Sequence, residues 1–404
     1  MLRRRNEAHD DRDQARWSRF SQYTPLDTLA PLHVRLLVQI DLEVAELREL
    51  AQRLSWRGPG PTRQRFLNVF MDQNNKCNLR CQMCGFSDPR VASIGKYDMP
   101  RWLYDRIVAE VFPHANYVCL SLMTEPFMTS DFADRLRAVN EARIPFSEII
   151  TNGTLLTEAA CHKIVDAGIS RVIFSIDGGT KAIFETVRVG ARFECVLKNF
   201  EMLRSIRSWR PAELPQLRIN HVLSELNVDH FTDFLDLVRD LRPEEIAVRT
   251  ISRMSNAVLQ ESTDDRFWSK VRDIREELRH FCATTGIRDS AYLRGRHTSI
   301  DLINDTGNKL LCPKPWDTIA IHPNGDAYPC MAWSREPVGN LATQSFDEIW
   351  NGSALSILRN EFTESQAGVD CLNCTIRRGD DDPDDDFFFR KLAKPLPSTA
   401  QPGG

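Results

Sequence analysis

The sequence predicts an α/β fold built on a parallel sheet, either a barrel or part of one, and two observations carry this prediction. Six short apolar segments typical of strands lie between Phe66 and Thr250, and helical segments separate them. Because a parallel strand needs a long crossover to reach its neighbour, strands that alternate with helices predict a parallel sheet. In such folds the chemistry lies at the carboxyl ends of the strands.

Length and composition narrow the class of protein. The 404 residues are 42% hydrophobic, which is enough to bury a core and predicts two domains. The net charge of -4 argues against nucleic acid or an anionic membrane as a partner. No apolar run approaches the roughly 20 residues that cross a bilayer, and the N-terminus lacks the apolar core of a secretion signal. We therefore expect a cytoplasmic protein whose 11 cysteines are metal ligands or buried thiols.

The elements up to residue 255 are expected in this order. Apolar residues at helical spacing predict a helix over 32–54, ended by "RGPGP", so residues 1–62 form a helical N-terminal extension. Residues 63–255 form the barrel domain. Strands are predicted at 66–71, 117–122, 148–150, 171–176, 217–223 and 245–250, with helices at 101–112, 131–142, 158–168 and 229–241.

The C-terminal third follows a different pattern. Residues 256–308 are predicted to form a helical connector. In the small domain at 309–379, "WDTIAIHPNGDAYPC" predicts a β-hairpin that turns at Asn324-Gly325, and "SFDE" at 345–348 predicts a capping box that begins a helix. Residues 380–404 are charged and then proline-rich, which predicts a disordered tail.

Three cysteines follow the first predicted strand. Cys77, Cys81 and Cys84 have the spacing C-x3-C-x2-C, and no fourth cysteine or histidine lies beside them. A structural zinc site requires four protein ligands, and a [4Fe–4S] cluster usually takes four thiolates. Three ligands therefore leave one iron of a cluster open to a group that is not protein, although a partial zinc site remains an alternative.

The three-cysteine motif, with Met83 before its last cysteine, resembles the signature of the radical S-adenosylmethionine (SAM) family. This resemblance implies a partial (β/α)6 TIM-like barrel in which Cys77, Cys81 and Cys84 bind a [4Fe–4S] cluster and the open iron chelates SAM. Reduction of the cluster then cleaves SAM to a 5′-deoxyadenosyl radical. The segments "LMTEPF", "TNGTLLT" and "SIDGG" resemble the ends of the next three strands in the family.

The same resemblance implies the SAM contacts. Glu125 corresponds to the glutamate that meets the SAM ammonium, although Met123-Thr124 replaces the two glycines of the family. Arg188 corresponds to an arginine on the SAM carboxylate. Asn152 is equally a turn residue, and Asp177 is alternatively a helix cap. The full implied set is Met83, Phe86, Thr124, Glu125, Asn152, Ser175, Asp177 and Arg188.

A second cysteine group lies near the C-terminus. Cys312 and Cys330 flank the predicted hairpin, and Cys371 and Cys374 form a C-x2-C pair. Four thiolates satisfy either a structural zinc or a closed [4Fe–4S] cluster. The segment resembles the SPASM/twitch module of radical SAM enzymes, and four cysteines match the twitch form, which implies one auxiliary [4Fe–4S] cluster. The predicted cofactors are thus two [4Fe–4S] clusters and SAM.

Twitch enzymes with similar cysteine spacing include sugar and aminocyclitol dehydrogenases of the butirosin type and, more widely, sugar epimerases of the avilamycin type. The resemblance implies an enzyme that abstracts hydrogen from a carbinol C–H of a carbohydrate-like natural product, giving epimerisation or two-electron oxidation. The alternative is a maturase of a ribosomally synthesised peptide, which installs a thioether, a crosslink or an epimer. A redox-sensing iron–sulfur protein is disfavoured because sensing does not require Glu125, Ser175 and Arg188.

Epimerisation needs a hydrogen donor, and Cys282 and Cys119 are the candidates. The implied partners are a sugar-like small molecule and a reductant of the flavodoxin or ferredoxin type, with no nucleic acid and no membrane.

Overall fold

The computed structural model describes residues 65–208, 214–251, 258–259, 262–289, 314–333, 335–363 and 394. The chain divides into two compact units, Met1–Gln52 and Arg53–Gly404, and all described residues belong to the second. The predicted helix at 32–54 lies outside the described residues, as does the tail except for Lys394. The Lys394 carbonyl accepts a hydrogen bond from the Tyr97 hydroxyl at 2.5 Å.

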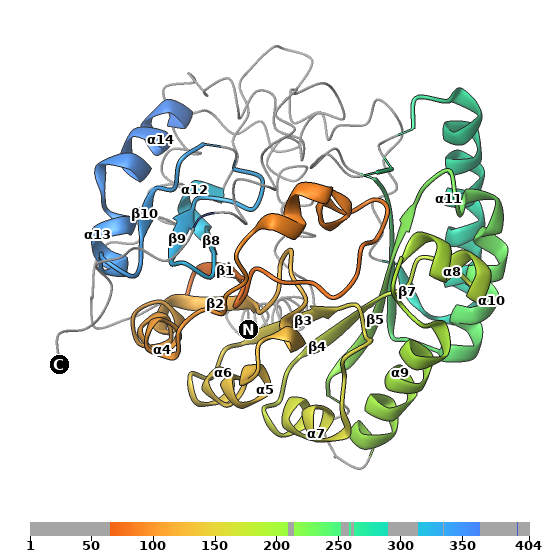
Figure 1. Ribbon diagram of the computed structural model, residues 1–404, viewed down its shortest axis with the longest axis horizontal. Helices are drawn as coiled ribbons and strands as arrows, with labels where there is room; N and C mark the ends of the chain where they lie inside the picture. Colours follow the sequence, from red (N-terminus) through yellow and green to blue (C-terminus); the bar gives the residue numbers. More distant parts are fainter. Residues whose placement is uncertain are drawn as a thin grey trace, which may run out of the picture. The chain divides into compact units, whose positions relative to one another are not determined.

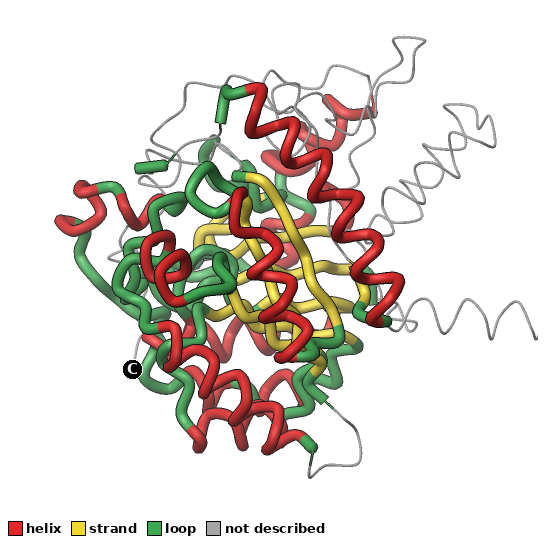
Figure 2. The backbone as a smooth tube through the Cα atoms, turned by 90° about the vertical axis from the view of Figure 1, so that its right-hand side faces the viewer, coloured by secondary structure: helices red, strands yellow, loops and turns green. Residues whose placement is uncertain are grey.

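One sheet organises this unit, with strand order β10-β9-β8-β1-β2-β3-β4-β5-β6-β7 (Figures 1 and 2). Neighbouring strands from β1 to β7 are parallel, and β8 pairs with β1 in parallel. The strands are β1 (Leu67–Met71), β2 (Ala115–Cys119), β3 (Phe146–Thr151), β4 (Arg171–Ser175), β5 (Gln216–Leu223), β6 (Glu245–Thr250), β7 (Arg288–Asp289), β8 (Thr318–Ile321), β9 (Asp326–Tyr328) and β10 (Gly339–Asn340). The predicted α/β partial barrel is confirmed.

Helices follow most strands. They are α4 (Arg101–Glu110), α5 (Phe132–Arg135), α6 (Arg137–Glu141), α7 (Glu158–Asp166), α8 (Lys181–Val187), α9 (Phe193–Arg207), α10 (Phe231–Leu241), α11 (Asp265–Thr285), α12 (Lys314–Asp317), α13 (Phe346–Trp350) and α14 (Ser353–Thr363). The helix predicted at 131–142 is interrupted at Leu136, between α5 and α6. In the predicted connector, α11 accounts for the helical part, and residues 290–308 lie outside the described residues.

The register separates two faces of the sheet. Phe174 of β4 contacts Phe200 of α9, and His221 of β5 contacts Phe234 of α10, so these side chains define the outer, helix-covered face. Side chains on a strand alternate between faces. The residues next to them therefore define the inner face. Arg171 and Arg218 both lie on it, two residues apart in register. The apolar core fills the layer between the outer face and the helices.

The C-terminal hairpin joins the sheet through β8 and β9, which are antiparallel. Gly325 adopts a left-handed φ of 91° in the turn, which explains the Asn-Gly dipeptide there. Ser345 and Glu348 form the predicted capping box at the start of α13. Both local motifs therefore fold as the sequence indicates.

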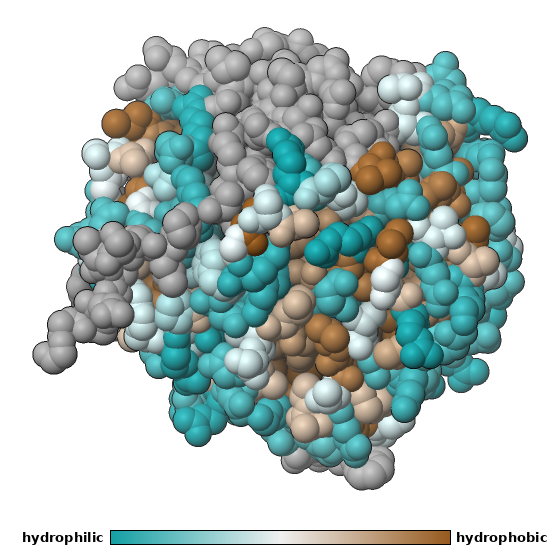
Figure 3. Space-filling view, viewed as in Figure 1, coloured by the Kyte–Doolittle hydropathy of each residue, from teal (hydrophilic) through white to brown (hydrophobic). Residues whose placement is uncertain are grey.

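The surface is mixed in character. Figure 3 shows hydrophobic residues scattered among more numerous hydrophilic ones on the face drawn in Figure 1. Among the described residues, no helix has both the length and the apolar character that a membrane span requires.

Gly179 supplies a test of how tightly the loop after β4 packs. A Cβ atom on Gly179 would lie 2.1 Å from the backbone of Asp233 in α10, which leaves no room for a methyl group. We expect Gly179→Ala to lower the free energy of unfolding by about 1–3 kcal/mol, as overpacking does. Urea denaturation measures this. Gly95→Ala is the control, because its Cβ would meet nothing within 4 Å; equal midpoints for the two variants would contradict the close packing.

Candidate active site

The three clustered cysteines lie on the loop that follows β1, at the carboxyl ends of the parallel strands. Cys81 is buried, and Cys77 and Cys84 are half-buried. The backbone N–H of Cys84 donates to the Cys81 carbonyl at 2.9 Å, which turns the loop back on itself. Cys77 and Cys84 pack against the buried side chains of Phe86, Val91 and Ile94. The loop thus holds its thiols together at the end of the sheet where chemistry is expected.

The surroundings of these thiols suit iron–sulfur ligation. Burial raises the pKa of all three thiols, that of Cys81 to about 12, so the thiolates need a metal to form at neutral pH. Two polar hydrogens approach them: the Asn152 amide lies 3.9 Å from the Cys77 sulfur, and the Arg188 guanidinium lies 3.8 Å from that of Cys81. Donors to sulfur favour the negative charge of a ligated thiolate.

A single metal ion is a poorer match for the described part of the chain. There, no set of three or more His, Cys, Asp or Glu side chains is arranged to hold one ion. In a cubane cluster each cysteine binds a different iron, so its thiolates do not converge on one point. Cys77, Cys81 and Cys84 are the residues that would each bind one iron of the predicted cluster.

Glu125 lies beside the cysteine loop with its carboxylate fully buried. It accepts hydrogen bonds from the backbone N–H of Asn152 and the hydroxyl of Thr151, both at 2.8 Å. Its own backbone N–H donates to the Lys76 carbonyl at 2.9 Å, which ties it to the residue before Cys77. Burial raises the pKa of Glu125 to about 7, against the effect of these hydrogen bonds. Within the described part of the chain, no ion pair neutralises this carboxylate, and Arg188 acts on it only from a distance.

Asp72 holds the segment that replaces the two glycines. Its carboxylate accepts hydrogen bonds from the backbone N–H groups of Leu122, Met123 and Thr124, and from the Thr124 hydroxyl at 2.8 Å. These bonds explain why β2 ends at Cys119, earlier than the predicted 122: the amides turn to Asp72 instead of a neighbouring strand. Burial is the largest cause of the raised pKa of Asp72. Sequence reasoning missed this residue, and its one signal was a carboxylate directly after a buried strand.

Asp177 and Arg188 form a buried ion pair of 2.7 Å on the side of Cys81. Burial lowers the pKa of Arg188, but Asp177 and Cys81 outweigh that effect and raise it. Asp177 also accepts from the backbone N–H of Val222 at 2.7 Å. Asp177 does not cap α8, because Thr180 is its N-cap. Arg188 thus lies between the Asp177 carboxylate and the Cys81 sulfur.

The other predicted SAM residues are placed as follows. Ser175 is the last residue of β4, half-buried on the inner face. Phe86 is buried in the small core beside the cysteines, and Met83 is half-buried on the loop itself. The Asn152 side-chain amide donates to the Asn78 side chain at 2.9 Å, and its Oδ1 accepts from the backbone N–H of Thr154, as in a turn. Both readings of Asn152, turn residue and site neighbour, therefore describe it.

The two candidate hydrogen donors lie in different places. Cys119 shares the inner face with Glu148, and its thiol donates to the Ser121 carbonyl at 3.1 Å. Cys282 lies on α11, shortly before Arg288, which pairs with the first residue of β6. Cys282 is therefore at the amino ends of the strands, opposite the cysteine loop. This placement disfavours Cys282 as a donor and leaves Cys119 facing the interior at some depth.

The second cysteine group is described only in part. Cys330 is half-buried just after β9. Cys312, Cys371 and Cys374 lie outside the described residues. Four-thiolate ligation of an auxiliary cluster therefore stays a prediction.

Two family models match the chain. The Radical SAM superfamily model matches residues 74–238, and the SPASM iron–sulfur cluster-binding domain matches residues 312–375. The chain therefore carries a radical SAM domain and a SPASM domain. The first implies a [4Fe–4S] cluster and SAM, and the second implies additional iron–sulfur clusters.

Curated relatives align at modest identity. The cofactor-modifying protein for tungsten-containing aldehyde ferredoxin oxidoreductase of Pyrococcus furiosus is 31% identical over 27% of this chain and 30% of its own length. The AdoMet-dependent heme synthase of Methanosarcina barkeri is 23% identical over 74% of this chain and 88% of its length. The PqqA peptide cyclase of Rhizobium meliloti is 23% identical over 72% and 76%. The chain spans less than two thirds of the first of these relatives.

Solved structures share the fold. SuiB of Streptococcus suis, crystallised with S-adenosylmethionine, superimposes with a TM-score of 0.58 at 16% identity, covering 77% of this chain and 71% of that one. At this identity the likeness shows the fold alone.

The buried carboxyl of Glu125 predicts that SAM binding depends on pH. With its pKa raised to about 7, the carboxyl is neutral below that pH and negative above it, and only the anion attracts an ammonium group. We expect the affinity for SAM to fall up to about tenfold per pH unit as the pH drops below 7. Calorimetric titration of the anaerobic enzyme measures it. Glu125→Gln should bind weakly with little pH dependence; an unchanged pH profile in that variant would contradict this role.

Proposed function

We propose that this chain, which carries a radical SAM domain and a SPASM domain, is a radical SAM enzyme that abstracts hydrogen from a carbinol C–H of a carbohydrate-like natural product. Epimerisation or two-electron oxidation is the outcome. The observation that supports the chemistry is the loop of three desolvated thiols at the carboxyl ends of the strands, with Glu125 and Arg188 beside it. The substrate class is supported by the twitch-like cysteine spacing.

Each residue near the loop has a proposed task. Cys77, Cys81 and Cys84 hold the cluster, which together with bound SAM supplies a 5′-deoxyadenosyl radical. Glu125 neutralises the ammonium group of SAM. Arg188, held by Asp177 at 2.7 Å, pairs with the SAM carboxylate. A fixed ion-pair partner orients the guanidinium before SAM arrives, so less side-chain entropy is lost on binding.

Burial protects this chemistry. Phe86 and Val91 are almost fully buried beside Cys77 and Cys84, and they keep water from that side of the cysteines. A reactive radical needs a site that excludes water and holds the substrate close to the reacting carbon. Cys312, Cys330, Cys371 and Cys374 would hold the proposed auxiliary cluster, which would supply an electron acceptor for an oxidation. A flavodoxin- or ferredoxin-type protein is proposed as the external reductant.

A peptide substrate is the second candidate. The alignment with the PqqA peptide cyclase covers 72% of this chain, and it supports a maturase of a ribosomally synthesised peptide. The proposed cofactor residues are the same in both cases. The two candidates differ only in the substrate that enters the barrel, a carbohydrate-like molecule or a peptide.

Iron analysis tests the cofactor assignment. We expect anaerobically reconstituted protein to hold about eight irons, since each [4Fe–4S] cluster contributes four. Cys84→Ala should keep about four irons and form no 5′-deoxyadenosine. Cys161→Ala, which removes a buried thiol on α7, is the control and should keep the full iron content. Retention of full iron by Cys84→Ala would contradict the ligand set.

Product analysis tests the substrate class. We expect mass spectrometry to show either a loss of two hydrogens from a glycoside after incubation with SAM and dithionite, or an unchanged mass with one deuterium incorporated in heavy water. The first result identifies oxidation to a carbonyl, and the second identifies epimerisation through an exchangeable donor. A modified precursor peptide, with all tested glycosides unchanged, would replace the first candidate by the second.

A further inference from the structure

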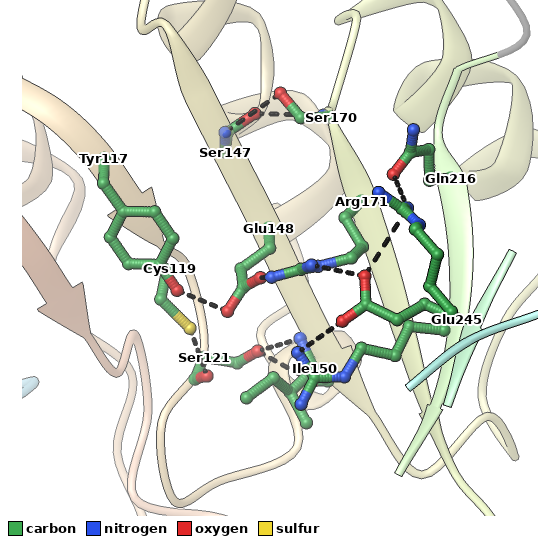
Figure 4. Close-up of polar contacts among 12 residues, drawn as sticks. Tyr117, Cys119, Ser121, Ser147, Glu148, Ile150, Ser170, Arg171, Gln216 and Glu245 are labelled. Atoms are coloured by element: carbon green, nitrogen blue, oxygen red, sulfur yellow. Dashed lines mark hydrogen bonds and ion pairs between the residues drawn. The ribbon is translucent and has the colours of Figure 1, made fainter. Parts of the chain in front are cut away.

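Five polar residues meet on the inner face of the barrel, near the amino ends of the strands, and Figure 4 shows most of them. We call this set the barrel-floor network. Its members come from β2 to β6 and are all buried: Tyr117, Glu148, Arg171, Arg218 and Glu245. The cysteine loop lies at the other end of the same strands. The mechanism proposed above does not use this network.

One part of the network is fully paired. Arg171 donates to Glu148 at 2.5 and 2.9 Å and to Glu245 at 2.9 Å, and the Tyr117 hydroxyl donates to Glu148. Burial lowers the pKa of Arg171, but the two carboxylates outweigh it and raise that pKa. Arg171 therefore has all the anionic partners that it needs.

Arg218 is not paired in this way. It is 5% exposed, and its nearest carboxylate oxygen, on Glu245, is 3.4 Å away and already accepts Arg171 at its other oxygen. The buried Nε–H of Arg218 has no hydrogen-bond partner. Burial, and next the charge of Arg171, lower its pKa to about 10. A buried guanidinium with a single long ion pair and an unpartnered Nε–H is costly for the protein to hold.

Further guanidinium groups lie near the network. Arg288 is a third guanidinium near Glu245, at 3.5 Å, so three cations share the two carboxylates of Glu148 and Glu245. Arg249, on the inner face of β6, adds a further repulsion on Arg218. Arg288 and Arg249 are exposed, so the buried charges are those of Arg171 and Arg218 against Glu148 and Glu245, and Arg218 has the longest of the buried ion pairs.

Asn220 lies on the same face of β5 as Arg218, nearer the carboxyl ends of the strands. It is two residues after Arg218 on β5, about 7 Å along the strand, and therefore on the same face. Its side-chain oxygen is buried without a hydrogen-bond partner. In register it lies beside Ser175 on β4, a proposed SAM contact, and Ala247 on β6. The Asn220 side-chain oxygen, which has no hydrogen-bond partner, thus lies between Arg218 and the proposed SAM site.

We propose that Arg218 anchors an anionic group of the substrate, a carboxylate or a phosphate, and that Asn220 accepts a hydrogen bond from a hydroxyl or N–H group of the same molecule. This inference rests on the proposed function, because it assumes that the substrate enters the barrel next to SAM. A carboxylate or phosphate matches the planar, multivalent donor set of a guanidinium. Anchored at this depth, the anion places the substrate's next atoms at the level of Ser175, where the radical is expected.

Anion-dependent stability tests the proposal without requiring turnover. The reconstituted enzyme, with saturating SAM so that Arg188 is occupied, is unfolded thermally with increasing inorganic phosphate or malonate. We expect at least one anion to raise the melting temperature, and Arg218→Met to weaken that anion's binding by about tenfold or more, as loss of a charge-assisted contact does. Stabilisation by phosphate alone would indicate a phosphorylated substrate, and stabilisation by malonate alone would indicate a substrate with a carboxylate.

Arg218→Met should also leave the melting temperature without anions unchanged or higher, because it removes a poorly paired buried charge. Arg207→Met is the matched control, since Arg207 pairs closely with Glu244 at 2.6 Å on the helix side; it should lower the melting temperature and keep the anion effect. Two outcomes overturn the proposal: no stabilisation by either anion, or equal stabilisation of Arg218→Met. Neither outcome affects 5′-deoxyadenosine formation, which tests the proposed function separately.

Discussion

The site depends on one constraint: the backbone of the cysteine loop must be fixed by its neighbours before its thiols can act together. The residue before Cys77 accepts a hydrogen bond from Glu125 after β2. Arg80 and Gln82 donate to the Val189 and Val187 carbonyls after β4. Because the loop is tied on two sides, its three sulfurs are positioned by the sheet rather than by the loop's own conformation. Shielding from water then follows from the small apolar core packed beneath.

Buried charge near the loop is handled in two ways. Arg188 is neutralised within the protein by Asp177, so its position is fixed before any ligand arrives. Asp72 and Glu125 instead rely on backbone N–H groups, which stabilise a carboxylate without cancelling its charge. For Asp72 these bonds anchor the backbone of Leu122, Met123 and Thr124. Glu125 accepts fewer hydrogen bonds and lies beside the cysteine loop, which is why we propose that its carboxylate meets a ligand.

The sequence was informative where the signal is local. Apolar runs located the strands, the spacing of Cys77, Cys81 and Cys84 located the reactive loop, and Asn324-Gly325 and Ser345 predicted a turn and a cap that the structure contains. It was uninformative where partners are distant. Arg171 contacts carboxylates 23 and 74 residues away, and no periodicity connects them. Asp72 was missed for the same reason, since its partners are backbone amides of another strand's end.

The two ends of the barrel therefore have different electrostatic requirements. At the carboxyl ends, Glu125 is a buried carboxylate that forms no ion pair with another described residue, which suits the ammonium of SAM. On the barrel floor, Arg218 is a cation with one long ion pair, to Glu245 at 3.4 Å, and an Nε–H without a hydrogen-bond partner. If Glu125 and Arg218 served folding alone, either could be replaced by an apolar residue. Such a replacement of a poorly paired buried charge is often neutral or stabilising. A buried carboxylate at one end of the barrel and a poorly paired guanidinium at the other are better explained by two adjacent ligands. One would carry a positive group toward the cysteines, and the other a negative group toward the barrel floor.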